Sequence, residues 1–299
     1  MFEVDTNFSS AKIVVAGVGG GGINAVNHMI SKKITGLNFI AVDTDEQALA
    51  NSQAPVHIQI DGKSPQEIQD EILKSLEGFN MVFIVAGMGG DTGTKLESIV
   101  ANYAKGLHAL TIAVVTLPLT IENLTEKAAD GINNLRQCVD SVVLIFNDKL
   151  AKIVDGKISL PETFDAANEI LAETVFGIAN LFTVPGVINL DLEDVQMMLE
   201  KSGYAFVGIG EATGESAVTQ ATKNALNSPI FEKGVQGAHS ILINICGGNK
   251  PLTMQEFNEA SMIIQDVAEK SAGIMLGTSI DESFANTVRV TIIATRFYR

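Results

Sequence analysis

The stretch Lys12-Ile13-Val14-Val15-Ala16-Gly17-Val18-Gly19-Gly20-Gly21-Gly22-Ile23-Asn24 decides the fold. It passes from a β-branched run to consecutive glycines, and residues 24–32 then have helical character, so it predicts a strand, a glycine loop and a helix. Glycines lack Cβ atoms and let the backbone approach phosphate oxygens, and the dipole of a helix beginning near Asn24 favours their negative charge. We therefore expect a phosphate-binding turn here.

Short apolar strands and helices alternate downstream of this stretch. Strands are predicted over 39–42, 81–86, 111–116 and 141–146, and helices over 65–76, 95–106 and 125–137. Continuous apolar strands joined by helices are typical of a parallel sheet covered on both faces, with right-handed crossovers. The first half of the chain is therefore expected to be a doubly wound α/β domain.

The second half begins with one long helical pattern over 161–182, which ends at Pro185-Gly186. Beyond it, strands are predicted over 205–209, 241–245, 273–278 and 288–295, and helices over 215–227 and 254–270. We expect three parts. They are a nucleotide-binding domain over 1–160, a central helix and linker over 161–186, and a smaller C-terminal α/β domain over 187–299.

A second glycine loop follows the strand over 81–86 and reads Gly87-Met88-Gly89-Gly90-Asp91-Thr92-Gly93-Thr94. Two such loops at the carboxyl ends of parallel strands can enclose one polyphosphate, with the hydroxyls of Thr92 and Thr94 available to its oxygens or to a cation. Thr94 is equally well placed to cap the helix that follows. The two loops together predict a nucleotide site more specifically than either loop alone.

The composition limits the partners. A formal net charge of −15 argues against nucleic acid, because binding a duplex requires clustered Lys and Arg. No apolar run approaches the roughly 20 residues of a membrane helix, and residues 1–10 lack the basic segment of a signal peptide. Cys138 and Cys246 lack metal-type spacing. We expect a cytoplasmic protein without membrane insertion, with reduced thiols and no metal site formed by the protein alone.

The first loop also fits a dinucleotide fingerprint. Gly17, Gly19 and Gly22 have the spacing G-x-G-x-x-G, and Asp43 follows about twenty residues later. This pattern supports a dinucleotide-dependent oxidoreductase as one alternative. It is the least favoured alternative, because no constellation suited to hydride transfer is visible among the four histidines and three tyrosines.

Five motifs in order resemble FtsZ, the family of bacterial tubulin-like cell-division GTPases. They are the two glycine loops and the segments Asn147-Asp148-Lys149-Leu150, Phe164-Asp165-Ala166-Ala167-Asn168-Glu169 and Asn189-Leu190-Asp191-Leu192-Glu193-Asp194. The resemblance implies a GTP-binding domain, a long central helix and a smaller C-terminal domain. It also implies head-to-tail filaments, in which the last motif completes the nucleotide site of the next subunit.

The resemblance implies roles for individual residues. The first loop would hold the diphosphate and the second the terminal phosphates, while Glu122 would meet the ribose. Phe164 would stack on the guanine ring, and Asn147 would form a hydrogen bond with the edge of that base. Glu169 would accept hydrogen bonds from N1 and the exocyclic amine of guanine. The cofactor-binding residues are Gly19, Gly20, Gly21, Gly22, Asn24, Asp43, Gly89, Gly90, Asp91, Thr92, Gly93, Thr94, Glu122, Asn147, Phe164 and Glu169. The cofactors are GTP or GDP, with Mg²⁺ and K⁺.

The motif that contains Asn189, Asp191 and Asp194 resembles the family's catalytic loop, whose acids position or polarise the attacking water. From the residues alone it is also an ordinary helix start. Asp191 is placed to cap that helix, and Asp194 to favour its dipole. Both interpretations stay open at the level of sequence.

Several departures from the family cluster at the same site. Asp91 and Lys95 stand where the family usually has glycine, and Glu126 stands where it has arginine. The chain is also shorter between Ala54 and Gln69, where the family has a glycine-rich segment that senses the terminal phosphate. Asp91 is expected to weaken nucleotide binding, and Lys95 to compensate in part as a point charge.

These departures leave two forms of the leading hypothesis. One is a GTPase that forms filaments with itself or with a related FtsZ subunit, at the division site. The other is a structural or copolymerising paralogue that does not hydrolyse GTP. The chain ends at Arg299 without the family's adaptor-binding peptide, so either the chain is trimmed or such adaptors are expected to be absent.

Overall fold

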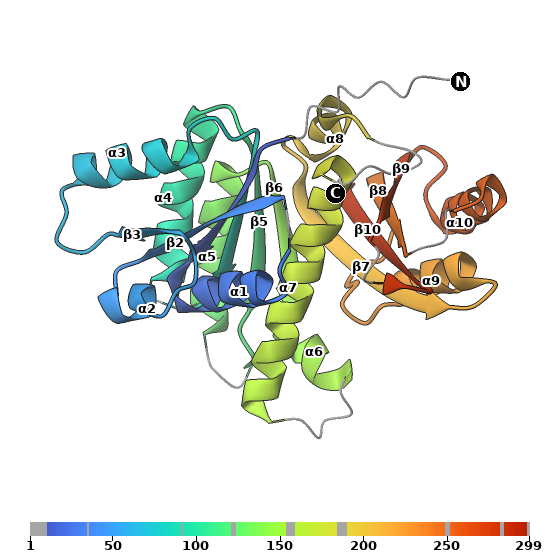
Figure 1. Cartoon of the computed structure of the whole chain (residues 1–299), viewed down its shortest axis with the longest axis horizontal. Coiled ribbons are helices and arrows are strands. Elements are labelled where there is room, and N and C mark those ends of the chain that lie inside the picture. The colour runs from blue at the N-terminus through green and yellow to red at the C-terminus, as the bar shows by residue number, and fades with distance from the viewer. Residues whose placement is uncertain are drawn as a thin grey trace.

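The computed structural model describes residues 11–34, 36–90, 92–120, 124–153, 159–183, 190–248, 252–281 and 284–297. They form one ten-stranded sheet in the order β3-β2-β1-β4-β5-β6-β7-β10-β8-β9 (Figure 1). The strands are β1 (Ile13–Val18), β2 (Leu37–Asp43), β3 (Val56–Gln59), β4 (Met81–Gly87), β5 (Leu110–Leu117), β6 (Ser141–Phe146), β7 (Gly203–Thr213), β8 (Ala238–Gly247), β9 (Gly273–Ile280) and β10 (Thr287–Phe297).

Helices cover both faces of this sheet. They are α1 (Gly19–Ser31), α2 (Glu46–Ala50), α3 (Pro65–Leu76), α4 (Gly93–Gly106), α5 (Thr125–Cys138), α6 (Asn147–Ile153), α7 (Leu160–Thr183), α8 (Leu192–Leu199), α9 (Ala217–Leu226) and α10 (Met254–Val267). None of these helices, within the described ranges, is long and apolar enough to cross a lipid bilayer.

The first six strands are parallel and form the doubly wound sheet that the sequence predicts. All six residues of β1 are buried, and alternate side chains enter opposite layers. Ile13 and Val15 pack in the layer of α1 and α7, whereas Val14 and Ala16 pack in the layer of α3, α4 and α5. Burial on both faces explains why these strands are continuously apolar.

The C-terminal strands extend the same sheet and do not form a separate one. β7 pairs in parallel with β6 through Ser141↔Gly203, Val142↔Tyr204 and Val143↔Ala205, and it pairs in antiparallel with β10. β8 and β9 complete this edge. The predicted fold class, a doubly wound domain followed by a long helix and a smaller C-terminal α/β domain, is therefore confirmed, and the sheet runs on from one domain into the other. The residue boundaries proposed for the three parts stay a prediction.

The long helix α7 lies between the two halves of the molecule (Figure 1). Its 24 residues correspond to about 36 Å. It contacts α1 on one side and β8 and β9 on the other. Gly177 allows the close approach to β10, because a Cβ there would lie 2.8 Å from the Thr291 methyl group. Elements at the two ends of α7 are thereby held far apart.

Some elements differ from the sequence prediction. α3 and β6 have the predicted bounds, whereas α1 begins at Gly19 and not near Asn24. The cause is tertiary packing, since a Cβ on Gly22 would lie 2.1 Å from the Val85 carbonyl oxygen of β4. The short elements α2, β3 and α6 were not predicted.

Candidate functional site

The two glycine loops meet at the carboxyl ends of β1 and β4. A Cβ on Gly19 would lie 2.9 Å from the backbone nitrogen of Gly93, and one on Gly21 would lie 3.3 Å from that of Gly87. Gly19 also has a φ of +69°, a left-handed backbone conformation that residues with a Cβ rarely adopt. These glycines are therefore needed for contact between the loops.

One edge of the joined loops is open. Gly20, Gly21, Asn24 and Gly90 are exposed, and a Cβ on Gly20 would meet nothing within 4 Å. α1 and α4 both begin here, and neither helix has a side-chain hydrogen bond at its N-cap within the described residues. Two uncapped helix N-termini present free N–H groups and the positive ends of two dipoles, an arrangement that attracts phosphate.

The two threonines of the second loop have different surroundings. Thr94 lies inside the first turn of α4, and its hydroxyl accepts a hydrogen bond from the Gly89 N–H at 2.9 Å. The alternative that Thr94 is the N-cap is therefore wrong, because Thr92 occupies that position. Thr92 instead places its hydroxyl 3.3 Å from that of Thr44. Asp91 lies outside the described residues.

Asp43 organises the turn after β2. It is 2% exposed, and its Oδ1 accepts hydrogen bonds from the N–H groups of Thr44 at 2.7 Å and Asp45 at 3.1 Å. Asp43 thus lies at the same sheet edge as the glycine loops, while its Oδ1 is engaged by the backbone. The sequence analysis did not single out Thr44. Its position directly after a strand end, next to an aspartate, was the available signal for a residue in this turn.

Asn147 and Phe164 lie on adjacent helices, α6 and α7. Asn147 is 4% exposed, and its Oδ1 has no hydrogen-bond partner within the described part of the chain. A buried amide oxygen without a partner is costly, and a donor on a bound base would satisfy it. Phe164 is 41% exposed, so one face of its ring is open to a ligand. Glu122 lies outside the described residues.

Glu169 is engaged by α1. Its carboxylate lies 2.6 Å from Nε2 of His28 and 2.9 Å from Nζ of Lys32. Partial burial opposes ionisation, but the hydrogen bonds from Lys32 and His28 outweigh it and hold the pKa of Glu169 below its ordinary value. Asn168, four residues after Phe164, shares the helix face of that ring, whereas Glu169 does not. Asn168 is thus a second base-contact candidate that the motif contained.

The acids of the last motif lie far from the glycine loops. Asp191 is the N-cap of α8, where its carboxylate accepts from the Glu193 N–H at 3.1 Å, and Asp194 is exposed in the first turn. Figure 1 places α8 by one end of α7 and α6 by the other. The capping interpretation of Asp191 is confirmed. Asn189 lies outside the described residues.

A buried acid lies one turn beyond the second loop. Glu97 in α4 is 0% exposed, and both carboxyl oxygens lack hydrogen-bond partners within the described ranges. Burial raises the pKa of Glu97 from 4.5 to about 8. The side chain is therefore mostly protonated, and so uncharged, at neutral pH.

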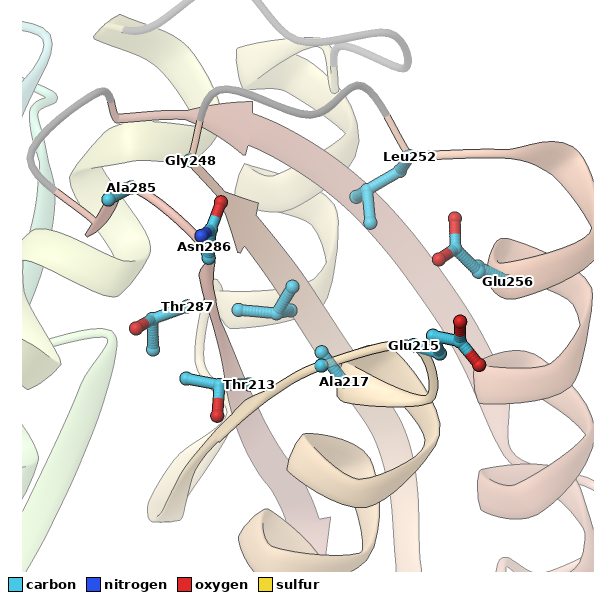
Figure 2. A pocket seen from close by; sticks show the side chains of 11 residues that line it. Thr213, Glu215, Ala217, Gly248, Leu252, Glu256, Ala285, Asn286 and Thr287 are labelled. Carbon is cyan, nitrogen blue, oxygen red and sulfur yellow. The ribbon is translucent and has the colours of Figure 1, made fainter.

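A hollow of about 430 Å³ in the C-terminal half is a different feature (Figure 2). It lies where β7 and β8 end, and Figure 2 shows Glu215 and Glu256 beside each other on one side of it. The charged residues in its lining are these two acids. Glu256 belongs to the capping box of α10 with Thr253. An acidic lining does not suit a phosphate group.

Comparison with known proteins bears on the whole chain. The family model described as "Tubulin/FtsZ family, GTPase domain" matches residues 12–155, and the one described as "FtsZ family, C-terminal domain" matches 203–298. CetZ2 of Haloferax volcanii, solved as a "GTPgS bound protofilament", has a TM-score of 0.79 and 20% identity, covering 95% of this chain and 92% of that chain. That likeness concerns the fold.

A second solved structure is more similar in sequence. The FtsZ of M. jannaschii, described as "FtsZ dimer, empty", has a TM-score of 0.89 and 35% identity, covering 97% of this chain and 89% of that chain. With both family models in sequence order and this identity along nearly the whole length, the chain belongs to the tubulin/FtsZ family of GTPases, and within it to the FtsZ family.

Proposed function

We propose that this chain binds GTP and GDP at the joined glycine loops and assembles head to tail, hydrolysing GTP at the junction between subunits. One observation carries the proposal. The phosphate loops and the acids Asp191 and Asp194 lie toward opposite ends of α7, so one molecule cannot bring them together. A second copy stacked end to end brings its acids to the first copy's nucleotide.

Hydrolysis at such a junction is mainly a matter of positioning. The N-termini of α1 and α4 stabilise the negative charge of the phosphates, and carboxylates from the neighbouring subunit orient the attacking water. Mg²⁺ and K⁺ are part of the proposal. The described residues contain no group of three His, Cys, Asp or Glu side chains suited to a metal. Magnesium would therefore be held mainly by phosphate oxygens, with the Thr92 hydroxyl an oxygen donor of the right type.

Base recognition is proposed to involve Asn147, Phe164 and Asn168. The ion pairs of Glu169 with His28 and Lys32 favour Asn168 over Glu169 as the contact to the base. The two residues are distinguished by Asn168→Ala and Glu169→Gln. We expect the first to reduce the preference for GTP over ATP, and the second to leave it within about twofold.

The proposed cellular role is bacterial cell division, with the protein at the division site. Membership of the GTPase family counts against the oxidoreductase alternative.

A copolymerising paralogue without hydrolysis is the second candidate. Asp91, Glu126 and the shorter segment between Ala54 and Gln69 favour it. Glu126 is exposed in the first turn of α5, where the resemblance leads one to expect arginine. In this form the acids on α8 would act on the nucleotide of a related FtsZ subunit.

The test is GTP turnover measured alongside sedimentation, with GTP, with GDP and without nucleotide. Pelleting that depends on GTP, with phosphate release, supports the first proposal. Pelleting only after addition of a conventional FtsZ supports the second. Failure both to bind guanine nucleotides and to pellet under any of these conditions rejects both candidates.

A further inference from the structure

The sheet has an open edge at β3. One side of β3 pairs with β2, and its other side pairs with no strand among the described residues. Val56 and His57 are exposed on this strand. An open edge presents unpaired N–H and C=O groups, to which another extended segment can add by main-chain hydrogen bonds. Figure 1 shows β3 and α3 at the end of the molecule away from the C-terminal half, so this edge faces outward.

A hollow of about 460 Å³ lies beside the open edge. Val56 and Ile58 of β3 line it together with Phe79, and Lys74, exposed on α3, also borders it. Ile58 packs in the layer of α3, and side chains alternate along a strand, so Val56 faces this layer and His57 faces the opposite one. Val56 is nevertheless 39% exposed. The edge thus has an apolar face that continues into a hollow, and a polar face at His57.

The first residues of the chain have the sequence of a strand that would fit this edge. Residues 1–10 lie outside the described ranges. Their even-numbered positions are apolar or β-branched and their odd-numbered positions are polar, with Phe2, Val4, Thr6 and Phe8 in the first set and Glu3, Asp5 and Asn7 in the second. Alternation with a period of two is typical of a strand that buries one face.

The charges of this segment and of the edge are complementary. Glu3 and Asp5 give the segment two negative charges. The side chains of His57 and Lys74 make no ion pair or hydrogen bond within the described part of the chain. With the even-numbered residues turned into the hollow, Glu3 and Asp5 would lie on the face of His57, which can donate a hydrogen bond to a carboxylate. Lys74 adds a positive charge beside the hollow.

The segment of the same molecule is too short to lie along this edge. Val56 is level with Ala16 of β1, because Ile40 pairs with both. A strand added beyond β3 lies about 14 Å from β1, and Ala11 lies about 16 Å below the level of Ala16, so the two points are about 21 Å apart. Phe8 is three residues from Ala11 and reaches only about 10 Å. The segment that fits the edge must therefore come from another molecule.

We propose that residues 2–8 of a second copy of this chain add as a strand to the open edge of β3, with their apolar side chains in the hollow beside α3. Main-chain hydrogen bonds to β3 supply affinity, and the hollow selects the apolar face of the segment. The contact involves neither the glycine loops nor α8. It is therefore independent of nucleotide and of head-to-tail assembly, and it joins molecules through the β3 edge.

The test measures self-association of the full chain by sedimentation velocity, in EDTA without nucleotide, at protein concentrations up to about 100 µM. The unmodified chain is expected to associate as its concentration rises. Val4→Asp places a charge on the apolar face of the segment and is expected to weaken association about tenfold or more. Asn7→Asp adds the same charge on the polar face and is the matched control, expected to stay within about threefold of the unmodified chain.

Val56→Asp tests the edge and is expected to weaken association as much as Val4→Asp does. The Val4→Asp chain keeps an intact edge, and the Val56→Asp chain keeps an intact segment. A mixture of the two is therefore expected to associate more strongly than either variant alone. Such complementation requires the segment and the edge to come from different molecules.

Three results overturn the inference. They are an unmodified chain that stays monomeric, a Val4→Asp variant that associates as the unmodified chain does, and a mixture that associates no better than its two components. Thermal melting checks the fold of each variant. If Val56→Asp does not fold, Lys74→Glu, which reverses an exposed charge beside the hollow, takes its place in the mixture. Because nucleotide is absent throughout, the result stands apart from any failure of GTP binding or turnover.

Discussion

Replacing Glu97 by glutamine should change how stability depends on pH. The carboxyl group is fully buried in α4, and burial raises its pKa from 4.5 to about 8. Below pH 4.5 the group is protonated in both the folded and the unfolded chain. Between pH 4.5 and 8 only the unfolded chain releases the proton, so the free energy of unfolding falls as pH rises.

The size of this effect follows from the two pKa values. Each pH unit in that window costs about 1.4 kcal/mol, so the loss is about 4 kcal/mol at pH 8 and levels off at about 5 kcal/mol roughly one pH unit higher. Glutamine has the same shape and does not ionise. Any cost of burying its amide is independent of pH, so the difference between the two pH profiles isolates the carboxyl group.

The assay is urea unfolding of the unmodified chain and Glu97→Gln at intervals from pH 5 to pH 8. We expect the unmodified chain to lose about 4 kcal/mol relative to the variant across this range. Glu77→Gln, at an exposed glutamate that ends α3, is the control for removing a charge. Parallel profiles for the unmodified chain and Glu97→Gln would refute the reasoning.

Three further outcomes are expected. Gly22→Ala should destabilise the fold by about 2 kcal/mol or more, because its Cβ would lie 2.1 Å from the Val85 carbonyl oxygen, whereas Gly20→Ala enters open space and should melt as the unmodified chain does. Phe164→Ala should weaken GTP binding about tenfold, measured by competition with a fluorescent nucleotide, because the ring stacks on the base. The melting temperature should not fall, because the ring is exposed, and an unchanged GTP affinity would remove Phe164 from the site. Asp194→Ala should abolish phosphate release. Its GTP affinity should stay unchanged, because α8 lies far from the glycine loops of its own subunit. Turnover equal to that of the unmodified chain would count against hydrolysis at the junction between subunits.

The fold was largely predictable because strong periodic signals and tertiary packing agree over most of the chain. Ser64 and Glu67 form the capping box of α3, and the apolar spacing gives the rest of that helix. α1 was predicted to begin too late because glycine is a poor helix former by itself. Its extra turn depends on close packing against β4, which no local pattern records.

The short elements were missed for a related reason. β3 has four residues and a half-polar sequence, and its strand character comes from pairing with β2. The pairing of β6 with β7 joins residues about sixty positions apart and is likewise a property of the tertiary structure.

At the candidate site, motifs identified loops better than they identified individual atoms. The two glycine loops were predicted to share one site, and they do meet. Which side chain faces the ligand depends on neighbours that the motif does not contain. Glu169 is turned to α1 by His28 and Lys32, and Thr44 is brought to Thr92 by the order of the strands.

In the proposed head-to-tail polymer, the placement of loops and acids toward opposite ends of α7 would give the two tips different chemistry. One tip would expose the glycine loops, and the other would expose the helix that Asp191 caps. A subunit that is defective at one end can still join through the other, where it stops growth and acts as a chain terminator. Small amounts of such a subunit should therefore shorten the polymers of the intact chain, and variants damaged at opposite ends should block opposite tips.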